Sequence, residues 1–141
     1  PNLWFDNQAK EAAEFYCSIF KNSKIHSASE MIVEFELDGM RFTALNGGPR
    51  HQFTEAISFI IYCEDQQEVD YFWNSFVANG GREDMCSWCK DRYGLSWQVI
   101  PVRFIEMMRA FAVTVAARGT RGGLGVGTQR ARGPLGNLGG L

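Results

Sequence analysis

Two cysteines in the second half of the chain have the spacing of a dithiol site. The segment DMCSWCKDRYGLSWQ places Cys86 and Cys89 three positions apart, as in redox active sites and zinc knuckles. A reactive pair would need a thiolate of lowered pKa, usually at a helix N-terminus. The pattern predicts a strand here, on which residues three apart point to opposite faces. We therefore expect Cys86 and Trp88 on one side and Cys89 on the other, one cysteine buried and one exposed. A dithiol oxidoreductase is the less favoured alternative.

Carboxylates and histidines could supply acid–base chemistry. Glu34 and Glu36 lie two residues apart on a predicted strand and therefore share a face. A solvent-facing row of charges explains them better than a catalytic pair, because ionised carboxylates are rarely buried without partners. His26 follows a predicted helix and His51 lies in a predicted loop, both places where a solvated histidine is the common case. These residues do not by themselves predict a catalytic centre.

The elements that must position a site follow an alternating pattern. The segment NLWF predicts a strand, and DNQAKEAAEFYCSIFKNS predicts a helix from apolar residues at spacings of three and four, with Asp6 or Asn7 as its cap. Two alternating stretches then flank Asp38-Gly39, which is the strongest short-range signal of a β-hairpin. The second half repeats the order with the strand AISFIIYC, the helix EDQQEVDYFWNSFVANGG and the strands of SWCKDRYGLSWQVIP.

The two halves can be aligned residue by residue. Asp6-Asn7-Gln8 matches Glu64-Asp65-Gln66, and Gly39-x-x-Phe42-Thr43 matches Gly94-x-x-Trp97-Gln98. An internal repeat of about 55 to 58 residues follows from this match. Two unrelated stretches that alternate by chance are the alternative.

Four segments resemble a known family: LWFDNQAKEAAEFYCSIF, VEFELDGMRFTALNGG, EAISFIIYC and CKDRYGLSWQVIP. They look like the vicinal oxygen chelate superfamily of glyoxalases, bleomycin-resistance proteins and dioxygenases. More narrowly, they resemble its PhnB-like branch, often labelled 3-demethylubiquinone-9 3-methyltransferase. The resemblance implies an α+β fold of two βαβββ modules, about residues 1–50 and 55–104, within a single domain that spans residues 1–108. Their curved mixed sheets would form a cup around a small-molecule site, commonly in a homodimer and sometimes by exchange of modules.

The resemblance also locates the positions where superfamily enzymes carry metal ligands, typically His and Glu. In this chain the visible positions are Thr43, Ser58 and Gln98. One amide and two hydroxyls bind a divalent ion weakly. We therefore predict no metal and no other cofactor.

What remains is an aromatic cup with a few polar groups, the usual composition of a small-ligand site. The expected ligand-binding residues are Trp4, Phe42, Thr43, Asn46, Ser58, Trp97 and Gln98. The alternative is that most of these aromatic residues fill the core. Two classes of function stay open. One is a protein that binds and sequesters a small molecule; the other is a metal-independent or metal-dependent enzyme of the superfamily, of lyase, dioxygenase or demethylubiquinone methyltransferase type.

The composition argues against nucleic-acid-binding and membrane proteins. The chain has 141 residues, of which 45% are hydrophobic, and a net charge of −2, as in an ordinary globular protein. This charge is too small to hold nucleic acid, and the apolar runs are shorter than the roughly 18 residues of a membrane span. We expect a cytoplasmic protein with reduced cysteines and with neither nucleic acid nor membrane as partner. Residues 109–141 form a Gly/Arg-rich tail that is expected to be disordered, with a frameshifted, misassigned sequence as the alternative explanation.

Overall fold

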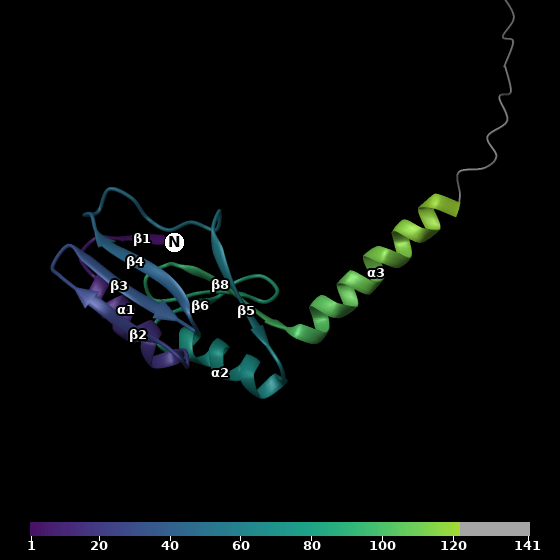
Figure 1. Cartoon of the computed structure of the whole chain (residues 1–141), viewed down its shortest axis with the longest axis horizontal. Coiled ribbons are helices and arrows are strands. Elements are labelled where there is room, and N and C mark those ends of the chain that lie inside the picture. Colours follow the sequence, from purple (N-terminus) through teal and green to yellow (C-terminus); the bar gives the residue numbers. More distant parts are fainter. Residues whose placement is uncertain (122–141) are drawn as a thin grey trace, which may run out of the picture. The chain divides into compact units, whose positions relative to one another are not determined.

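The structure is a computed structural model that describes residues 1–121, the last three by their backbone alone (Figure 1). The elements of the first half are β1 (Asn2–Phe5), α1 (Ala9–Ile19), β2 (Lys24–Ala28), β3 (Ile32–Leu37) and β4 (Met40–Asn46). Those of the second half are β5 (Ser58–Cys63), α2 (Gln66–Val77), β6 (Arg82–Glu83), β7 (Trp88–Lys90) and β8 (Ser96–Pro101). The helix α3 (Val102–Arg121) follows them.

The chain divides into two units, and the first, residues 1–105, carries every expected site residue. The second unit begins at Glu106 and contains most of α3, so that helix continues well past residue 108. Residues 122–141 of the expected Gly/Arg-rich tail lie outside the described residues. Among residues 1–121, no helix combines the length and the apolar character that a membrane crossing requires.

The two halves of the first unit have the same strand order. Within the described residues, one four-stranded sheet has the order β1-β4-β3-β2 and the other the order β5-β8-β7-β6. In each sheet the first strand pairs in parallel with the last strand of its module, and the other neighbours pair antiparallel. This confirms the predicted α+β fold of two βαβββ modules, with two open mixed sheets.

The predicted hairpin and the second helix form as expected. Asp38 and Gly39 join β3 to β4 with φ values of 48° and 81°, the pair of positive φ angles that a type I′ turn requires. The side chain of Asp65 caps α2 by accepting a hydrogen bond of 2.8 Å from the backbone N–H of Glu68.

The first helix starts differently from the prediction. The apolar positions at spacings of three and four are buried as expected, and they are Ala9, Ala12, Ala13, Tyr16 and Ile19. However, Gln8 occupies the N-cap position, so the expected cap at Asp6 or Asn7 is wrong. The first free N–H of the helix, at Ala9, instead donates to Oδ1 of Asn46 at the end of β4, at 2.8 Å. A tertiary contact thus replaces the local cap.

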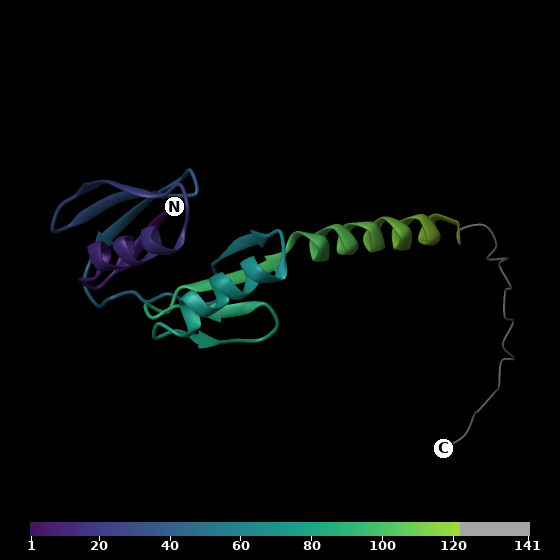
Figure 2. The same cartoon turned by 90° about the horizontal axis from the view of Figure 1, so that it is seen from below.

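Both modules share one core on the helix side of their sheets. In Figure 2, α1 lies against one side of the first sheet and α2 against one side of the second. The ring of Tyr16 on α1 lies 6.4 Å from that of Phe35 in its own sheet and 5.5 Å from that of Trp97 in the other. Phe42 and Phe59 meet across the modules at 5.3 Å. Because side chains alternate along a strand, the residues between these positions point to the other face of each sheet, which we call the open face.

A buried carboxylate links the modules inside this core. Asp91 is 4% exposed, and its Oδ2 accepts hydrogen bonds from Tyr16 Oη at 2.6 Å and from Trp97 Nε1 at 2.9 Å. Its Oδ1 accepts from the backbone N–H groups of Tyr93 and Leu95 at 2.8 and 3.1 Å. Burial raises the pKa of Asp91, and these four hydrogen bonds oppose the rise. The network fixes Trp97 and ties α1 to the second module.

Candidate functional site

The open face of the second sheet carries a group of polar side chains in adjacent positions. On β8, Ser96 lies opposite Ser58 of β5 and opposite Lys90 of β7. Gln98 is the next residue of β8 on the same face. Residues directly opposite each other in a sheet share a face, so these four side chains form one group, which we call the β8 patch.

The structure brings together two of the three positions at which superfamily enzymes carry metal ligands. Gln98 Nε2 donates a hydrogen bond of 2.8 Å to Ser58 Oγ. Thr43, the third, lies on β4 opposite Glu34 and therefore on the open face of the first sheet. Thr43 and Gln98 occupy equivalent places in the repeat but belong to two different sheets.

Lys90 and Ser96 are the most deeply buried members of the β8 patch. Lys90 is 7% exposed and Ser96 is 1% exposed. The ammonium of Lys90 donates to the carboxylate of Glu55, whose own side chain is 57% exposed. This hydrogen bond is the main cause that lowers the pKa of Glu55. Ser96 Oγ has no hydrogen-bond partner within the described part of the chain.

A hollow of 440 Å³ follows β5 beside the β8 patch, within the usual size range of ligand sites. The first module contributes Leu37, Met40 and Phe42 to its wall. The second module contributes Ser58, Ile60, Tyr62 and Trp97. A second hollow, of 640 Å³, adjoins it and shares Phe20, Tyr62 and Phe72.

The hollow and the patch have apolar side chains within reach. Ile60 and Tyr62 project from the open face of β5 and are 45% and 54% exposed. Trp88 lies opposite Gln98 on β7 and is half-buried. A ligand with an apolar body and a few oxygen atoms would therefore find both kinds of contact here.

The expected site residues divide between the hollow and the core. Phe42, Ser58 and Trp97 line the same hollow, and Gln98 is bonded to Ser58. Phe42 and Trp97 nevertheless belong to the shared core, at 5% and 2% exposure. Strand alternation separates each of them from its polar neighbour, Thr43 or Gln98, which faces the opposite side.

Two further expected residues are engaged by the fold. Asn46 uses Oδ1 for the N–H of Ala9, and its Nδ2 donates to the carbonyl of Glu30 at 2.7 Å. Trp4 donates from Nε1 to the carbonyl of Gly48 at 2.8 Å, and its ring meets that of His51 edge-on at 4.9 Å. Asn46 therefore ties the end of β4 to the start of α1 and to the turn between β2 and β3, and Trp4 holds the loop that leaves β4.

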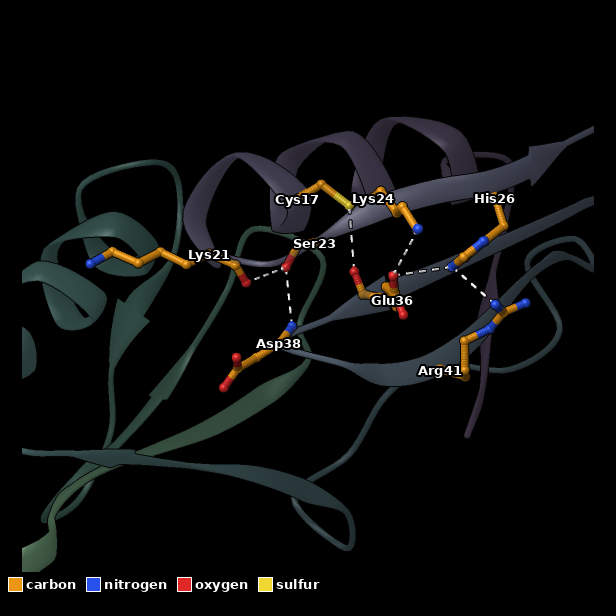
Figure 3. Close-up of polar contacts among 8 residues, drawn as sticks. All are labelled: Cys17, Lys21, Ser23, Lys24, His26, Glu36, Asp38 and Arg41. Atoms are coloured by element: carbon orange, nitrogen blue, oxygen red, sulfur yellow. Dashed lines mark hydrogen bonds and ion pairs between the residues drawn. The ribbon is translucent and has the colours of Figure 1, made fainter.

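The open face of the first sheet carries paired charges (Figure 3). Glu36 Oε1 lies 3.6 Å from Lys24 Nζ and 3.4 Å from His26 Nε2. Arg41 Nη1 lies 3.0 Å from the same nitrogen of His26. Glu34 is exposed and accepts a hydrogen bond of 2.8 Å from Ser27 Oγ. The row of charges that the sequence predicts is therefore present, with partners on β2 and β4 that the strand pattern alone did not identify.

The residues of the β8 patch fit a divalent cation poorly. An amide and two hydroxyls are weak ligands, and the Lys90 ammonium would repel a cation. Within residues 1–121, no three His, Cys, Asp or Glu side chains gather in the manner of a metal site.

The cysteine pair takes the expected exposure but not the expected position. Cys89 lies buried on β7, and Cys86 is exposed, which confirms that one is inside and one outside. Cys86 is not on a strand, however: it lies in a turn before β7 with a φ of 58°. Burial, followed by the charge of Asp91, raises the pKa of Cys89 to about 12. A buried thiol with a raised pKa is the opposite of a redox nucleophile.

Comparisons with known proteins identify one family and several structures with a similar fold. A sequence model of the 3-demethylubiquinone-9 3-methyltransferase family matches residues 1–100. A Bacillus cereus PhnB protein that carries this family name is 29% identical over 72% of this chain and 96% of its own, with a TM-score of 0.62. A glyoxalase/bleomycin resistance protein from Albidiferax ferrireducens is 13% identical over 71% of this chain and 93% of its own, with a TM-score of 0.54. A lactoylglutathione lyase from Agrobacterium tumefaciens is 19% identical over 74% of this chain and 92% of its own, with a TM-score of 0.50. Among curated proteins, none matches the sequence.

Proposed function

The chain belongs to the 3-demethylubiquinone-9 3-methyltransferase family, in the vicinal oxygen chelate superfamily, and we propose that it binds a small molecule without a divalent metal. The proposed site is the hollow along β5 together with the β8 patch. The observation that carries the proposal is the hydrogen-bonded pair of Gln98 and Ser58, beside the aromatic side chains of the hollow. An apolar wall with a few placed polar groups suits a ligand that is partly apolar and carries oxygen atoms.

Metal independence follows from the chemistry of the side chains. In place of His and Glu, the second sheet presents a hydroxyl and an amide that are already bonded to each other. A buried lysine stands two strands from Ser58 in the same row. This combination favours an oxygenated or anionic ligand over a cation.

We further propose that the functional form is a homodimer. Each sheet has an open face with exposed apolar side chains, Ile32 on the first sheet and Ile60 and Tyr62 on the second. A second copy of the chain would bury these side chains and close the site against solvent. Sedimentation velocity is expected to give twice the mass of 15.9 kDa, and a monomer at micromolar concentration would contradict the dimer.

An enzyme of the same superfamily is the second candidate, favoured by the description of the family, which names a methyl transfer. Methyl donors are usually held by a Gly-rich turn between a strand and a helix. Here Gly47-Gly48 follows β4, and Gly80-Gly81 ends α2, where the N–H of Gly81 donates to the carbonyl of Phe76 at 3.1 Å. These glycines serve a turn and a helix C-terminus, so binding is favoured over methyl transfer.

The proposal is tested by screening metabolites against the full chain and against Gln98→Ala. A ligand of the proposed site should bind the wild type, and its affinity for Gln98→Ala should be about tenfold lower or more, as expected when a buried hydrogen-bonding group is removed. Gln52→Ala, an exposed glutamine in the loop before β5, is the matched control and should leave binding unchanged. Ligands whose affinity is the same for wild type and Gln98→Ala would contradict this site.

A further inference from the structure

The ammonium of Lys90 is buried, and its hydrogen-bond partner is a carboxylate on the protein surface. It lies at the open face of β7, and its partner Glu55 sits in an exposed turn directly before β5. That turn is held by few contacts: the N–H of Ile57 reaches the carbonyl of Thr54 at 3.4 Å, and Ile57 itself is 66% exposed. A buried ammonium needs a partner, and here that partner is a carboxylate whose side chain is 57% exposed.

Beside Lys90, the Ser96 hydroxyl is buried and without a partner in the described residues. The two residues lie directly opposite each other on β7 and β8. Buried hydroxyls without a hydrogen-bond partner are rare in folded proteins. Lys90 and Ser96 thus place two hydrogen-bond donors side by side, and Glu55 accepts from Lys90 alone.

We propose that Lys90 and Ser96 form a subsite for the carboxylate of the ligand, and that the side chain of Glu55 occupies part of this subsite until a ligand displaces it. One carboxylate oxygen accepts from Lys90 Nζ and the other from Ser96 Oγ, which uses both donors. The ligand is therefore a small carboxylic acid whose apolar body lies over Trp88 and Ile60. This inference rests on the proposed function, since it assigns the ligand class to the same site.

The surrounding charge supports an anion. Arg82 lies opposite Lys90 on β6, and its charge contributes to the lowered pKa of Glu55. Asp91 is the next residue after Lys90 but accepts its hydrogen bonds in the shared core, on the other side of the sheet. Two cations thus face the subsite, and the carboxylate that balances them comes from an exposed turn.

The test compares benzoate with its neutral counterpart benzamide by calorimetric titration of the full chain. Benzoate should bind at least about tenfold more tightly, as for a hydrogen bond to a charged group, and Lys90→Met should abolish that preference. Glu55→Gln should raise the affinity for benzoate about two- to fivefold, the effect of removing one exposed ion-pair partner. Glu55→Gln should not change the affinity for benzoate when it is combined with Lys90→Met, because Glu55 then has no ammonium to bind.

Two outcomes separate the subsite from the proposed function. Equal affinity for benzoate and benzamide, with both weakened by Gln98→Ala, would overturn the subsite and leave the proposed function standing. Binding of neither probe would overturn the subsite, whereas the proposed function fails only if the metabolite screen also gives no ligand whose affinity depends on Gln98. If Lys90→Met does not fold, Glu55→Gln still tests the proposal, because Glu55 is exposed. An unchanged affinity of Glu55→Gln for benzoate would contradict the displacement of Glu55 by the ligand.

Discussion

Replacing Asp91 by Asn should destabilise the protein strongly although the side chain keeps its shape. The carboxylate accepts four hydrogen bonds, two at each oxygen. An amide has only one acceptor oxygen, and the backbone N–H groups of Tyr93 and Leu95 would take it. The new NH₂ group would then face Tyr16 Oη, which can turn and accept, and the indole N–H of Trp97, which cannot.

The expected loss of stability follows from the hydrogen bonds that an asparagine at position 91 could no longer accept. One buried N–H left without an acceptor costs about 1–3 kcal/mol, and the three remaining hydrogen bonds become neutral, a loss that the lower cost of burying a neutral side chain reduces to about 1 kcal/mol. The free energy of unfolding should therefore fall by about 2–4 kcal/mol. Tyr16→Phe removes one donor and leaves three bonds to the carboxylate, so its cost should be smaller, about 1–2 kcal/mol.

Urea unfolding of the full chain, followed by circular dichroism and tryptophan fluorescence, measures both changes. Asp70→Asn is the matched control, because Asp70 is exposed on α2 and bonds only to Gln66 among the contacts described, and it should change stability by less than about 0.5 kcal/mol. A loss below about 1 kcal/mol for Asp91→Asn would refute the reasoning, as would a larger loss for Tyr16→Phe than for Asp91→Asn.

Three further predictions test other parts of the structure. Gly47→Ala should destabilise by about 1–3 kcal/mol in a thermal or urea titration, because a methyl group there would overlap the indole of Trp4; a neutral effect would contradict the packing of the loop after β4. Iodoacetamide at about pH 8 should modify the exposed Cys86 well before Cys89, whose thiol stays protonated, and peptide mass mapping that found Cys89 modified first would disprove its burial. The hydrogen bond from Lys90 lowers the pKa of Glu55, so the folded chain releases that proton more readily than the unfolded chain. The pair's contribution to stability is present above the ordinary glutamate pKa and should be lost as the pH falls below it, through the lowered pKa of the folded chain. Glu55→Gln should flatten that part of the stability–pH curve, and an identical curve for both proteins would exclude the effect.

The fold could be predicted because its signals are local and repeated. The Asp38-Gly39 turn, the apolar spacing of α1 and the alternation along β3 each determine one element, and the repeat extends them to the second half. The start of α1 could not be predicted in the same way, because the group that accepts its first N–H is Asn46, 37 residues away. Position in the sequence gives no sign of such a contact.

The site could be predicted in part. The family resemblance placed Gln98 and Ser58 at two positions of one site, and the structure joins them by a hydrogen bond. The aromatic residues were grouped with them, although strand alternation puts Trp97 on the opposite face from Gln98. Lys90 and Ser96 were missed because a lysine beside a turn looks exposed in the sequence. Its burial becomes visible only once β7 and β8 are paired and Glu55 is placed next to them.

Native mass spectrometry of the full chain tests whether the proposed site binds its ligand without a divalent metal. The protein would be purified without chelator and measured before and after EDTA, in the presence of a metabolite mixture. We expect the same mass per chain in both samples, and a small-molecule adduct that is kept after EDTA treatment but lost in Gln98→Ala. A divalent ion bound at one per chain, and released by EDTA together with the adduct, would contradict this expectation.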